Sequence, residues 1–425
     1  MLFVSKLVPG DAARVLLAFL VVTVVMPLGA KVSSASGSGP STARAPGASF
    51  KPVPFSDLPG WEADDHAAAF GAFLKSCARL IAAARAGNKA GKVAIPPELL
   101  AICADAARIS GAVDRAAAKA FFESRFEPHA VVHKGSSGLL TGYYEPVLDG
   151  SRKQDARFKT PIYKRPPDLV NLVEEAQRGA KGAVLTHARR TDKGNVPFAT
   201  RAEIDGGALA GKGLELLYMT DAVDVFFMQV QGSGRIRLPD GSKIRVHYDG
   251  KNGHPYTSIG RYLIDKGLLA ADKLSLAALQ KWLRADPQRA THVMHQNASY
   301  VFFRELKGAE AENVLGVLEI PLTPGRSLAV DAGVHALGSP VYVSAPKLTH
   351  AIQGKPFQRL MIAQDVGSAI KGPERGDLYF GSGDAAGALA GITKHPGKFH
   401  VLLPRPASAG ASPATPSRAR QAKQQ

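Results

Sequence analysis

The order of helical and strand-like segments along the chain constrains its fold more than any other feature. Three segments near the N-terminus carry apolar side chains at helical spacing: 64–86, 97–107 and 113–126. From Leu139 onward, short runs rich in β-branched and aromatic residues alternate with turn signals. Two further helical segments, 258–266 and 274–285, precede a second strand-rich region after Tyr300. This order predicts a mainly β protein with two β-rich domains and N-terminal helices packed on one of them.

Individual elements follow from local residue types. Asp64 or Asp65 can cap the first helix, and Pro97 suits the first turn of the second. The third helix should stop before Pro128. The expected strands include the apolar and β-branched runs 225–231, 235–238, 243–248, 314–320, 340–343, 358–363 and 398–403.

The N-terminal 30 residues have the features of a signal peptide. Lys6 and Arg14 supply positive charge before an apolar run at 15–28, and small residues follow the run. The run is shorter than the ~20 apolar residues that span a bilayer, so we expect cleavage, with an uncleaved anchor as the alternative. A lipoprotein would require a cysteine just after the run, and none lies there. The localisation expected is therefore the periplasm.

Both ends of the exported chain have a low-complexity composition. Residues 31–49 are rich in Ser, Gly, Ala and Pro and predict a flexible linker. Residues 405–425 combine Pro, Ala and Ser with four basic residues and no acidic one, which predicts a disordered basic tail.

The formal net charge of +17 favours an anionic partner. For an exported protein, the anionic partner would be the cell wall or the membrane surface, and we expect peripheral contact with one of them. Nucleic acid is the competing interpretation. The export signal and the lack of a basic motif interleaved with aromatic residues argue against nucleic-acid binding.

Cys77 and Cys103 are the only two cysteines. Both fall on apolar faces of neighbouring predicted helices, and an oxidising compartment allows them to pair. Two buried free thiols are the alternative. The export signal favours the disulfide.

One segment places a carboxylate in an apolar setting. The strand-like run 360–364 leads directly into Asp365, which small residues follow. Partial desolvation would raise the pKa of a carboxyl group there and let it donate a proton near neutral pH. An aspartate that merely ends a strand and caps a turn is the more common case on physical grounds alone.

Other segments could contact a sugar. Tyr143 and Tyr144 lie beside Gly142, and aromatic faces suit the apolar faces of sugar rings. In the run 229–234, glycines would allow close approach of a ligand while Gln231 and Ser233 bond to it. Ordinary strand tyrosines and a hairpin bend are the alternatives. The histidines and cysteines show no metal-ligand spacing, so we expect neither metal nor cofactor.

Taken together, five segments resemble the signature blocks of the membrane-bound lytic murein transglycosylase A family. They are residues 141–146, 230–234, 248–267, 296–303 and 364–372. The resemblance extends over about residues 50–404. Its C-terminal part resembles the three-aspartate domain, which Asp331, Asp365 and Asp377 match.

The resemblance implies a double-psi β-barrel with a smaller β-barrel domain inserted in it and a glycan groove between them. The implied limits are 50–144 and 297–404 for the two parts of the larger barrel and 145–296 for the insert. Asp365 matches the catalytic residue. Groove-lining or substrate-binding positions are matched by Thr141, Tyr143, Tyr144, Gln231, Gly232, Ser233, Asp331 and Asp377.

The sequence departs from the family pattern in three places. The lipidated cysteine of the lipoprotein members is missing, which puts membrane anchoring in question. Ser368 stands where the family leads us to expect a glycine, and the basic tail has no counterpart.

The implied activity is that of a lytic transglycosylase, a carbon–oxygen lyase. It would cleave the β-1,4 bond from N-acetylmuramic acid to N-acetylglucosamine and leave a 1,6-anhydro end, with Asp365 as the single acid/base. The partners expected are peptidoglycan glycan strands, bound by a monomer. A hydrolase with Glu145, Asp331 or Asp377 as a second carboxylate and a non-catalytic wall-binding protein remain the alternatives.

Overall fold

The computed structural model describes residues 48–86, 95–109, 111–135, 138–173 and 185–406. The predicted signal peptide, residues 31–47 of the predicted linker and residues 407–425 of the predicted tail lie outside these ranges. The last two linker residues, Ala48 and Ser49, belong instead to strand β1 (Ala48–Pro52).

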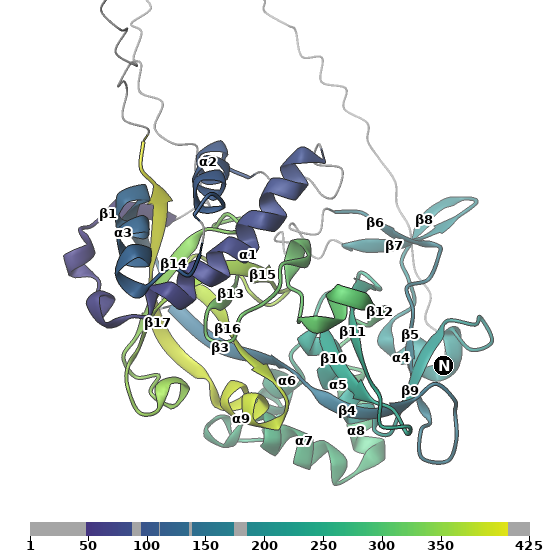
Figure 1. Ribbon diagram of the computed structural model, residues 1–425. Helices are drawn as coiled ribbons and strands as arrows, with labels where there is room; N and C mark the ends of the chain where they lie inside the picture. Colours follow the sequence, from purple (N-terminus) through teal and green to yellow (C-terminus); the bar gives the residue numbers. More distant parts are fainter. Residues whose placement is uncertain (1–47, 87–94, 110, 136–137, 174–184, 407–425) are drawn as a thin grey trace, which may run out of the picture. The chain divides into compact units, whose positions relative to one another are not determined.

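Six strands from the two halves of the chain close into a barrel (Figure 1). Around the ring the order is β3, β16, β13, β15, β14 and β17, and β17 pairs with β3 to complete it. Two pairs are parallel, β3 with β16 and β13 with β15, as expected of a double-psi barrel, and the other four are antiparallel. The strands are β3 (Gly138–Glu145), β13 (Ser327–Val330), β14 (Pro340–Ala345), β15 (Phe357–Val366), β16 (Arg375–Ser382) and β17 (Lys394–Pro404).

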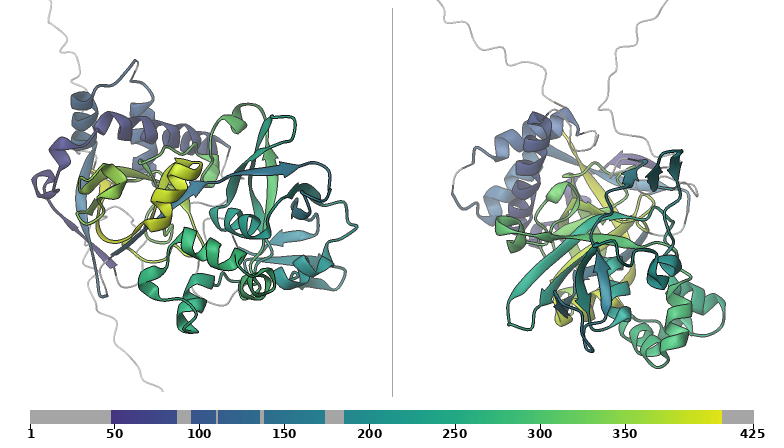
Figure 2. Two further views of the ribbon diagram at one scale, coloured as in Figure 1. Left: turned by 90° about the horizontal axis from the view of Figure 1, so that it is seen from below. Right: turned by 90° about the vertical axis from the view of Figure 1, so that its right-hand side faces the viewer.

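Three N-terminal helices cover one side of the barrel, where Figures 1 and 2 show them in purple and blue. They are α1 (His66–Arg85), α2 (Pro97–Ala106) and α3 (Arg115–Arg125). As the sequence predicted, Asp65 caps α1, and its side chain accepts a hydrogen bond from the backbone of Ala68 at 3.1 Å. Strand β2 (Phe126–His133) follows α3 and joins β1 to β17.

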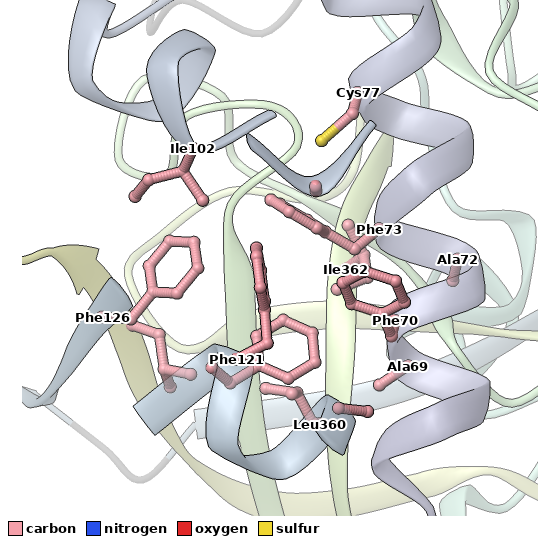
Figure 3. Packing of buried hydrophobic residues seen from close by; sticks show 14 of the residues in the cluster. Ala69, Phe70, Ala72, Phe73, Cys77, Ile102, Phe121, Phe126, Leu360 and Ile362 are labelled. Carbon is pink, nitrogen blue, oxygen red and sulfur yellow. The ribbon is translucent and has the colours of Figure 1, made fainter. Parts of the chain in front are cut away.

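Aromatic side chains fill the space between these helices and the barrel (Figure 3). Phe70 and Phe73 of α1 meet Phe121 and Phe122 of α3 in edge-to-face and tilted contacts. By length and composition α1 would also suffice to cross a membrane. Its apolar face is buried against the barrel, as in the core helix of a globular domain.

A disulfide joins Cys77 of α1 to Cys103 of α2. Both residues lie in the core between helices and barrel. The prediction that the two cysteines pair is confirmed by the structure, because the apolar faces that carry them pack against one another.

A second β-rich region is inserted between β3 and β13. Six of its strands form one sheet in the order β12-β11-β10-β4-β9-β5, and its edge strands β12 and β5 approach each other, so the sheet curls toward a small barrel. The strands are β4 (Val147–Ser151), β5 (Thr160–Tyr163), β9 (Glu215–Met219), β10 (Ser233–Arg237), β11 (Lys243–Lys251) and β12 (Val301–Leu306). The predicted fold class, a barrel with N-terminal helices and a smaller inserted β-domain, is confirmed.

The remaining elements surround these two sheets. A small sheet contains β6 (Leu169–Asn171), β7 (His187–Thr191) and β8 (Gly194–Val196). The helices are α4 (Arg201–Glu203), α5 (Ala222–Gln231), α6 (Ile259–Asp265), α7 (Leu276–Arg284), α8 (Pro287–Met294) and α9 (Asp384–Ile392), of which α9 packs on β3 and β16.

Two expected strands are not strands. Residues 225–231 belong to α5, which Asp221 caps and Gly232 ends with φ of 82°. Apolar side chains cover both faces of α5, with Phe226 packing in one core and Met228 in another, so the run lacks the polar face by which a helix is recognised.

The run 314–320 is an irregular turn instead of the expected strand. It contains a short 3-10 turn, Val317–Glu319, in which Leu318 and Glu319 have positive φ. Leu318 packs its side chain against the core beneath the N-terminal helices, and this contact overrides the strand propensity of the run.

Strand β12 lies beyond residue 296, the expected limit of the insert, and pairs with a strand of the insert. Strand β12 pairs with β11 along four consecutive residues and again at Val301. We therefore propose that the insert extends to Leu306 and that the second part of the larger barrel begins after it.

Candidate functional site

A cavity of about 510 Å³ is lined from one side by the six-stranded barrel and from the other by the inserted region. Seven of the residues singled out in the sequence line it: Thr141, Tyr143, Gln231, Gly232, Ser233, Asp365 and Asp377. They come from four segments that are far apart in the sequence, and the fold brings them together.

Asp365 is the second-last residue of strand β15, and it lines this cavity. Its Oδ1 atom accepts hydrogen bonds from the backbone N–H groups of Val366 at 2.9 Å and Val317 at 3.2 Å. Both backbone donors therefore engage the same oxygen and fix the orientation of the carboxylate. A fixed carboxylate at the wall of a cavity is suited to transfer a proton to or from a bound ligand.

The residue before Asp365 anchors its strand to helix α1. Gln364 is fully buried, and its Nε2 donates to the Ala72 carbonyl and to Ser76 Oγ, each at 2.8 Å. Its Oε1 accepts a hydrogen bond from Ser327 Oγ. Every polar atom of this buried amide side chain has a partner, which holds the end of β15 in place.

The turn that supplies the Val317 N–H has an unusual backbone. Leu318 and Glu319 adopt φ of 57° and 55°, in the left-handed region that costs non-glycine residues energy. Gly316 packs so closely on β15 that a Cβ atom there would lie 2.4 Å from the Gln364 carbonyl oxygen. Such strain next to Asp365 persists only where the surroundings hold it.

On the barrel side, a hydrogen-bonded chain joins three polar residues. Arg375 Nη2 donates to Thr141 Oγ1 at 2.7 Å, and Thr141 Oγ1 donates to Asp377 Oδ1 at 2.6 Å. Burial raises the pKa of Asp377, although the Arg375 guanidinium and the Thr141 hydroxyl oppose this. The fold thus holds a second carboxyl group in the cavity wall, with Thr141 supplied by the neighbouring strand β3 and Arg375 by the same strand, β16.

Tyr143 lies beside both carboxyl groups. Its hydroxyl is buried, and burial followed by the charges of Asp365 and Asp377 holds the pKa of Tyr143 well above its usual range. The ring packs against Tyr379 with centroids 5.2 Å apart. Tyr143 therefore stays protonated and can donate a hydrogen bond toward the carboxylates or a ligand.

On the insert side, the predicted polar residues gather where α5 ends. Gln231 is the last residue of α5, Gly232 is its left-handed cap and Ser233 begins β10. The Gln231 Oε1 atom accepts the backbone N–H of Tyr144 at 3.0 Å. This bond fixes the polar helix end against barrel strand β3.

Three cationic residues of the cavity were not singled out by the sequence analysis: Arg201, Lys251 and the Arg375 already described. Lys251 is 4% exposed, and its Nζ contacts Ser368 Oγ at 3.3 Å, across from the insert to the loop after Asp365. Arg201 is 3% exposed and bonds the carbonyls of Asn297 and Ser299. Lys251 lies in the signature segment 248–267, but that resemblance assigned it no role, and no local pattern marks Arg201.

Two of the expected residues do not line the cavity. The Tyr144 ring packs on Gly387 of α9. Asp331 accepts the backbone N–H groups of Gly333 at 3.1 Å and Gly372 at 2.8 Å, and so fixes the end of the loop that follows Asp365. Their contacts with the cavity are therefore indirect.

Glu145, a candidate second carboxylate, is also not in the cavity lining. Its side chain is fully buried and paired with Arg245, with Nε and Oε1 2.5 Å apart. Ser382 Oγ donates to its other oxygen at 2.6 Å. Within the described residues, no group of three or more His, Cys, Asp or Glu side chains is placed to hold a metal ion.

Two domain families match the chain. Residues 139–304 match the MltA specific insert domain, and residues 326–403 match the 3D domain. The first covers barrel strand β3 from Leu139 and the inserted region as far as Arg304. The second covers strands β13 to β16 and nearly all of β17, and it includes Asp365.

Curated relatives carry the same name in several bacteria. The chain is 36% identical to the membrane-bound lytic murein transglycosylase A of Vibrio cholerae over 273 residues, and 35% identical to that of Escherichia coli K12 over 271 residues. Each match covers 63% of this chain and 66% of the relative, just under two thirds of its length.

Solved structures extend the similarity to nearly whole chains. A membrane-bound lytic murein transglycosylase from Agrobacterium tumefaciens is 37% identical, with a TM-score of 0.73, over 84% of this chain and 98% of that one. MltA from Neisseria gonorrhoeae is 37% identical, with a TM-score of 0.69, over 86% and 94%. The Escherichia coli MltA with bound chitohexaose is 28% identical, with a TM-score of 0.58, over 86% and 95%. With both domain families, their order and the fold in agreement, the chain belongs to the membrane-bound lytic murein transglycosylase A family.

Proposed function

We propose that this protein is a peptidoglycan lytic transglycosylase in which Asp365 is the single catalytic acid and base. The observation that carries the proposal is the placement of Asp365. Its carboxylate is held by two backbone donors at the wall of a cavity that the barrel and the inserted region share. The E. coli relative, whose structure contains chitohexaose, supports a glycan as the ligand of this cavity.

The first step would be protonation of the leaving group. Asp365 begins this step protonated, and the two backbone N–H groups that bond its Oδ1 atom hold the carboxyl group in place. Asp365 donates this proton to the glycosidic oxygen, and the bond from muramic C1 to that oxygen breaks. The 2-acetamido group of the sugar can stabilise the oxocarbenium-like centre that forms, as in substrate-assisted glycosidases.

The second step would return the proton to Asp365. The carboxylate takes the proton of the muramic C6 hydroxyl, whose oxygen bonds to C1 and closes a 1,6-anhydro ring. No water is consumed and the residue ends in its starting state. A single carboxyl group is therefore enough, whereas a hydrolase requires two.

The groove residues would hold the glycan by hydrogen bonds and apolar contact. Thr141, Gln231, Gly232 and Ser233 would contact the sugar from both walls of the cavity, and Asp377 would act with Thr141. Tyr143 offers its hydroxyl beside Asp365. Tyr144 and Asp331 would act indirectly, by fixing β3 against α5 and the loop after Asp365.

A two-carboxylate hydrolase is less well supported by the geometry. Glu145 is buried in an ion pair with Arg245, and Asp331 bonds loop amides outside the cavity lining. Asp377 lines the cavity, but it is bonded to Thr141 and its pKa is raised by burial. Among the described residues that line the cavity, Asp377 is the one carboxylate besides Asp365.

We further propose that the protein acts in the periplasm as a monomer on peptidoglycan strands, in peripheral contact with the wall or membrane. The net charge of +17 supports attraction to an anionic envelope surface. The test of the activity is digestion of purified sacculi followed by mass spectrometry. Products with 1,6-anhydromuramic ends support a lytic enzyme, reducing ends indicate a hydrolase, and no turnover indicates a binding protein.

A further inference from the structure

The strained turn beside Asp365 is held from outside the cavity by charged residues of two different elements. Arg79 of α1 donates from Nε to the Leu318 carbonyl at 3.1 Å and pairs through Nη2 with Glu319. Arg304 of β12 bonds the other oxygen of Glu319 at 3.0 Å. We call Arg79, Glu319 and Arg304 the turn clamp.

The turn clamp acts on the backbone segment that bonds to the proposed catalytic group. Leu318 and Glu319 are two consecutive non-glycine residues with positive φ, and they directly follow Val317, whose N–H donates to Asp365 Oδ1. A turn of this kind relaxes unless other contacts impose it. Here the Leu318 side chain is packed against the helical core, and Arg79 binds the carbonyl of the same residue.

Helix α1 supports Asp365 from a second direction. Ala72 and Ser76 bind Gln364, the residue before Asp365, and Arg79 binds the turn. These three helix residues are spaced at i, i+4 and i+7, so they lie on one face of α1. One helix face therefore contacts both backbone segments that position the carboxylate.

We infer that Arg79 is a positioning residue for the proposed reaction. Through Glu319 and the Leu318 carbonyl it holds the turn whose Val317 N–H fixes Asp365. This inference rests on the proposed function, but it assigns a role to a residue that lies outside both domain matches. Arg79 does not line the cavity.

The experiment compares Arg79→Ala and Arg79→Lys in the full chain with wild type. Arg85→Ala is the matched control, since Arg85 is an exposed arginine in the last turn of the same helix. Release of soluble muropeptides from sacculi gives kcat and KM across pH, and thermal unfolding and glycan binding confirm that each variant is folded.

We expect Arg79→Ala to lower kcat about tenfold or more, because small displacements of a catalytic group are costly, while KM stays within about twofold. The alkaline limb of the pH–rate profile should move to higher pH, since a backbone N–H donated to a carboxylate favours its ionised form. Arg79→Lys should recover part of kcat and Arg85→Ala should match wild type.

A shift of the alkaline limb distinguishes a loss of Asp365 positioning from a general loss of protein stability. The other titratable groups that line the cavity are unchanged by these substitutions: Tyr143, Arg201, His247, Tyr248, Lys251, Tyr256, Arg375 and Asp377. In the double variant Arg79→Ala/Glu319→Gly, glycine removes the left-handed strain at one position, so kcat should rise above that of Arg79→Ala. Arg79→Ala with wild-type kcat and an unmoved alkaline limb would overturn the inference.

Two further variants keep the test decisive. If Arg79→Ala does not fold, Glu319→Gln replaces it, because that side chain is 45% exposed and the change removes only the charge. A few-fold loss of kcat with the same pH shift supports the turn clamp, and unchanged kinetics contradict it. Asp365→Asn is run in parallel: if it stays active the proposed function fails, and if it is inactive while Arg79 variants behave as wild type only the positioning role fails.

Discussion

Asp377 is well bonded in the folded protein, yet its buried position disfavours the charged form of its carboxyl group. Its carboxyl group accepts a hydrogen bond from Thr141 and lies near the Arg375 guanidinium, but burial outweighs both and raises its pKa. The folded state therefore binds a proton at Asp377 at higher pH than the unfolded state does. Its contribution to stability is fully present below the unfolded pKa and is lost as pH rises through the folded pKa.

Asp377→Asn should consequently remain stable at neutral pH. The amide oxygen can still accept from Thr141, and no charge has to be buried. Thermal unfolding at pH 7.5 should show a midpoint equal to or above that of wild type, and this advantage should shrink as pH falls toward 4. A wild type that is more stable at pH 7.5 by a margin independent of pH would contradict this.

At this scale, much of the site could be predicted from the sequence. Asp365, Thr141, Tyr143, Gln231 and Ser233 all line the cavity between the barrel and the insert, as the signature segments implied. The places of Lys251 and Arg201 in the cavity lining could not be predicted, because only tertiary packing brings them there. Lys251 meets Ser368, 117 positions further along the chain, and nothing local in either segment marks this contact.

At the scale of elements, the disulfide ties α1 to α2. The bond between Cys77 and Cys103 closes a loop with a sequence separation of 26. In the chain-entropy account, its removal in Cys77→Ala/Cys103→Ala should lower the free energy of unfolding by about 3 kcal/mol. Denaturant unfolding measures the loss, and thiol labelling of denatured, unreduced wild type should find no free thiol. Two reactive thiols in that sample would contradict the pairing.

Helix α1 could be predicted well because its apolar residues lie on one face with a capping aspartate before it. Helix α5 and the turn at 317–319 could not. The apolar residues of α5 face two cores at once, and the turn takes its backbone conformation from contacts with α1. The spacing of apolar residues does not reveal the secondary structure of an element that packs against the core on several sides.

At the scale of the whole molecule, a buried ion pair joins the barrel to the insert. Glu145 ends β3 of the barrel, and Arg245, 3% exposed, lies in β11 of the insert and also donates to the Ala311 carbonyl. Glu145→Gln would leave the arginine charge buried without its carboxylate. We expect a loss of roughly 3–5 kcal/mol in the free energy of unfolding.

The double variant Glu145→Gln/Arg245→Met removes both charges and should lose less than the two single variants added together. Denaturant unfolding of the four proteins completes the cycle. Strict additivity would show that the pair does not couple the barrel to the insert. Folded Glu145→Gln should still release anhydro products, since Glu145 is not in the cavity.

The central claim is that one carboxyl group performs both proton transfers. Its most direct test is mass spectrometry of the muropeptides that wild type and Asp365→Asn release from purified sacculi. Wild type should give 1,6-anhydromuramic ends. Asp365→Asn should keep its fold and its glycan binding but lose turnover by several orders of magnitude, because general-acid and general-base catalysis each contribute roughly 10²–10⁴-fold. Reducing ends from wild type, or wild-type release by Asp365→Asn, would contradict the mechanism.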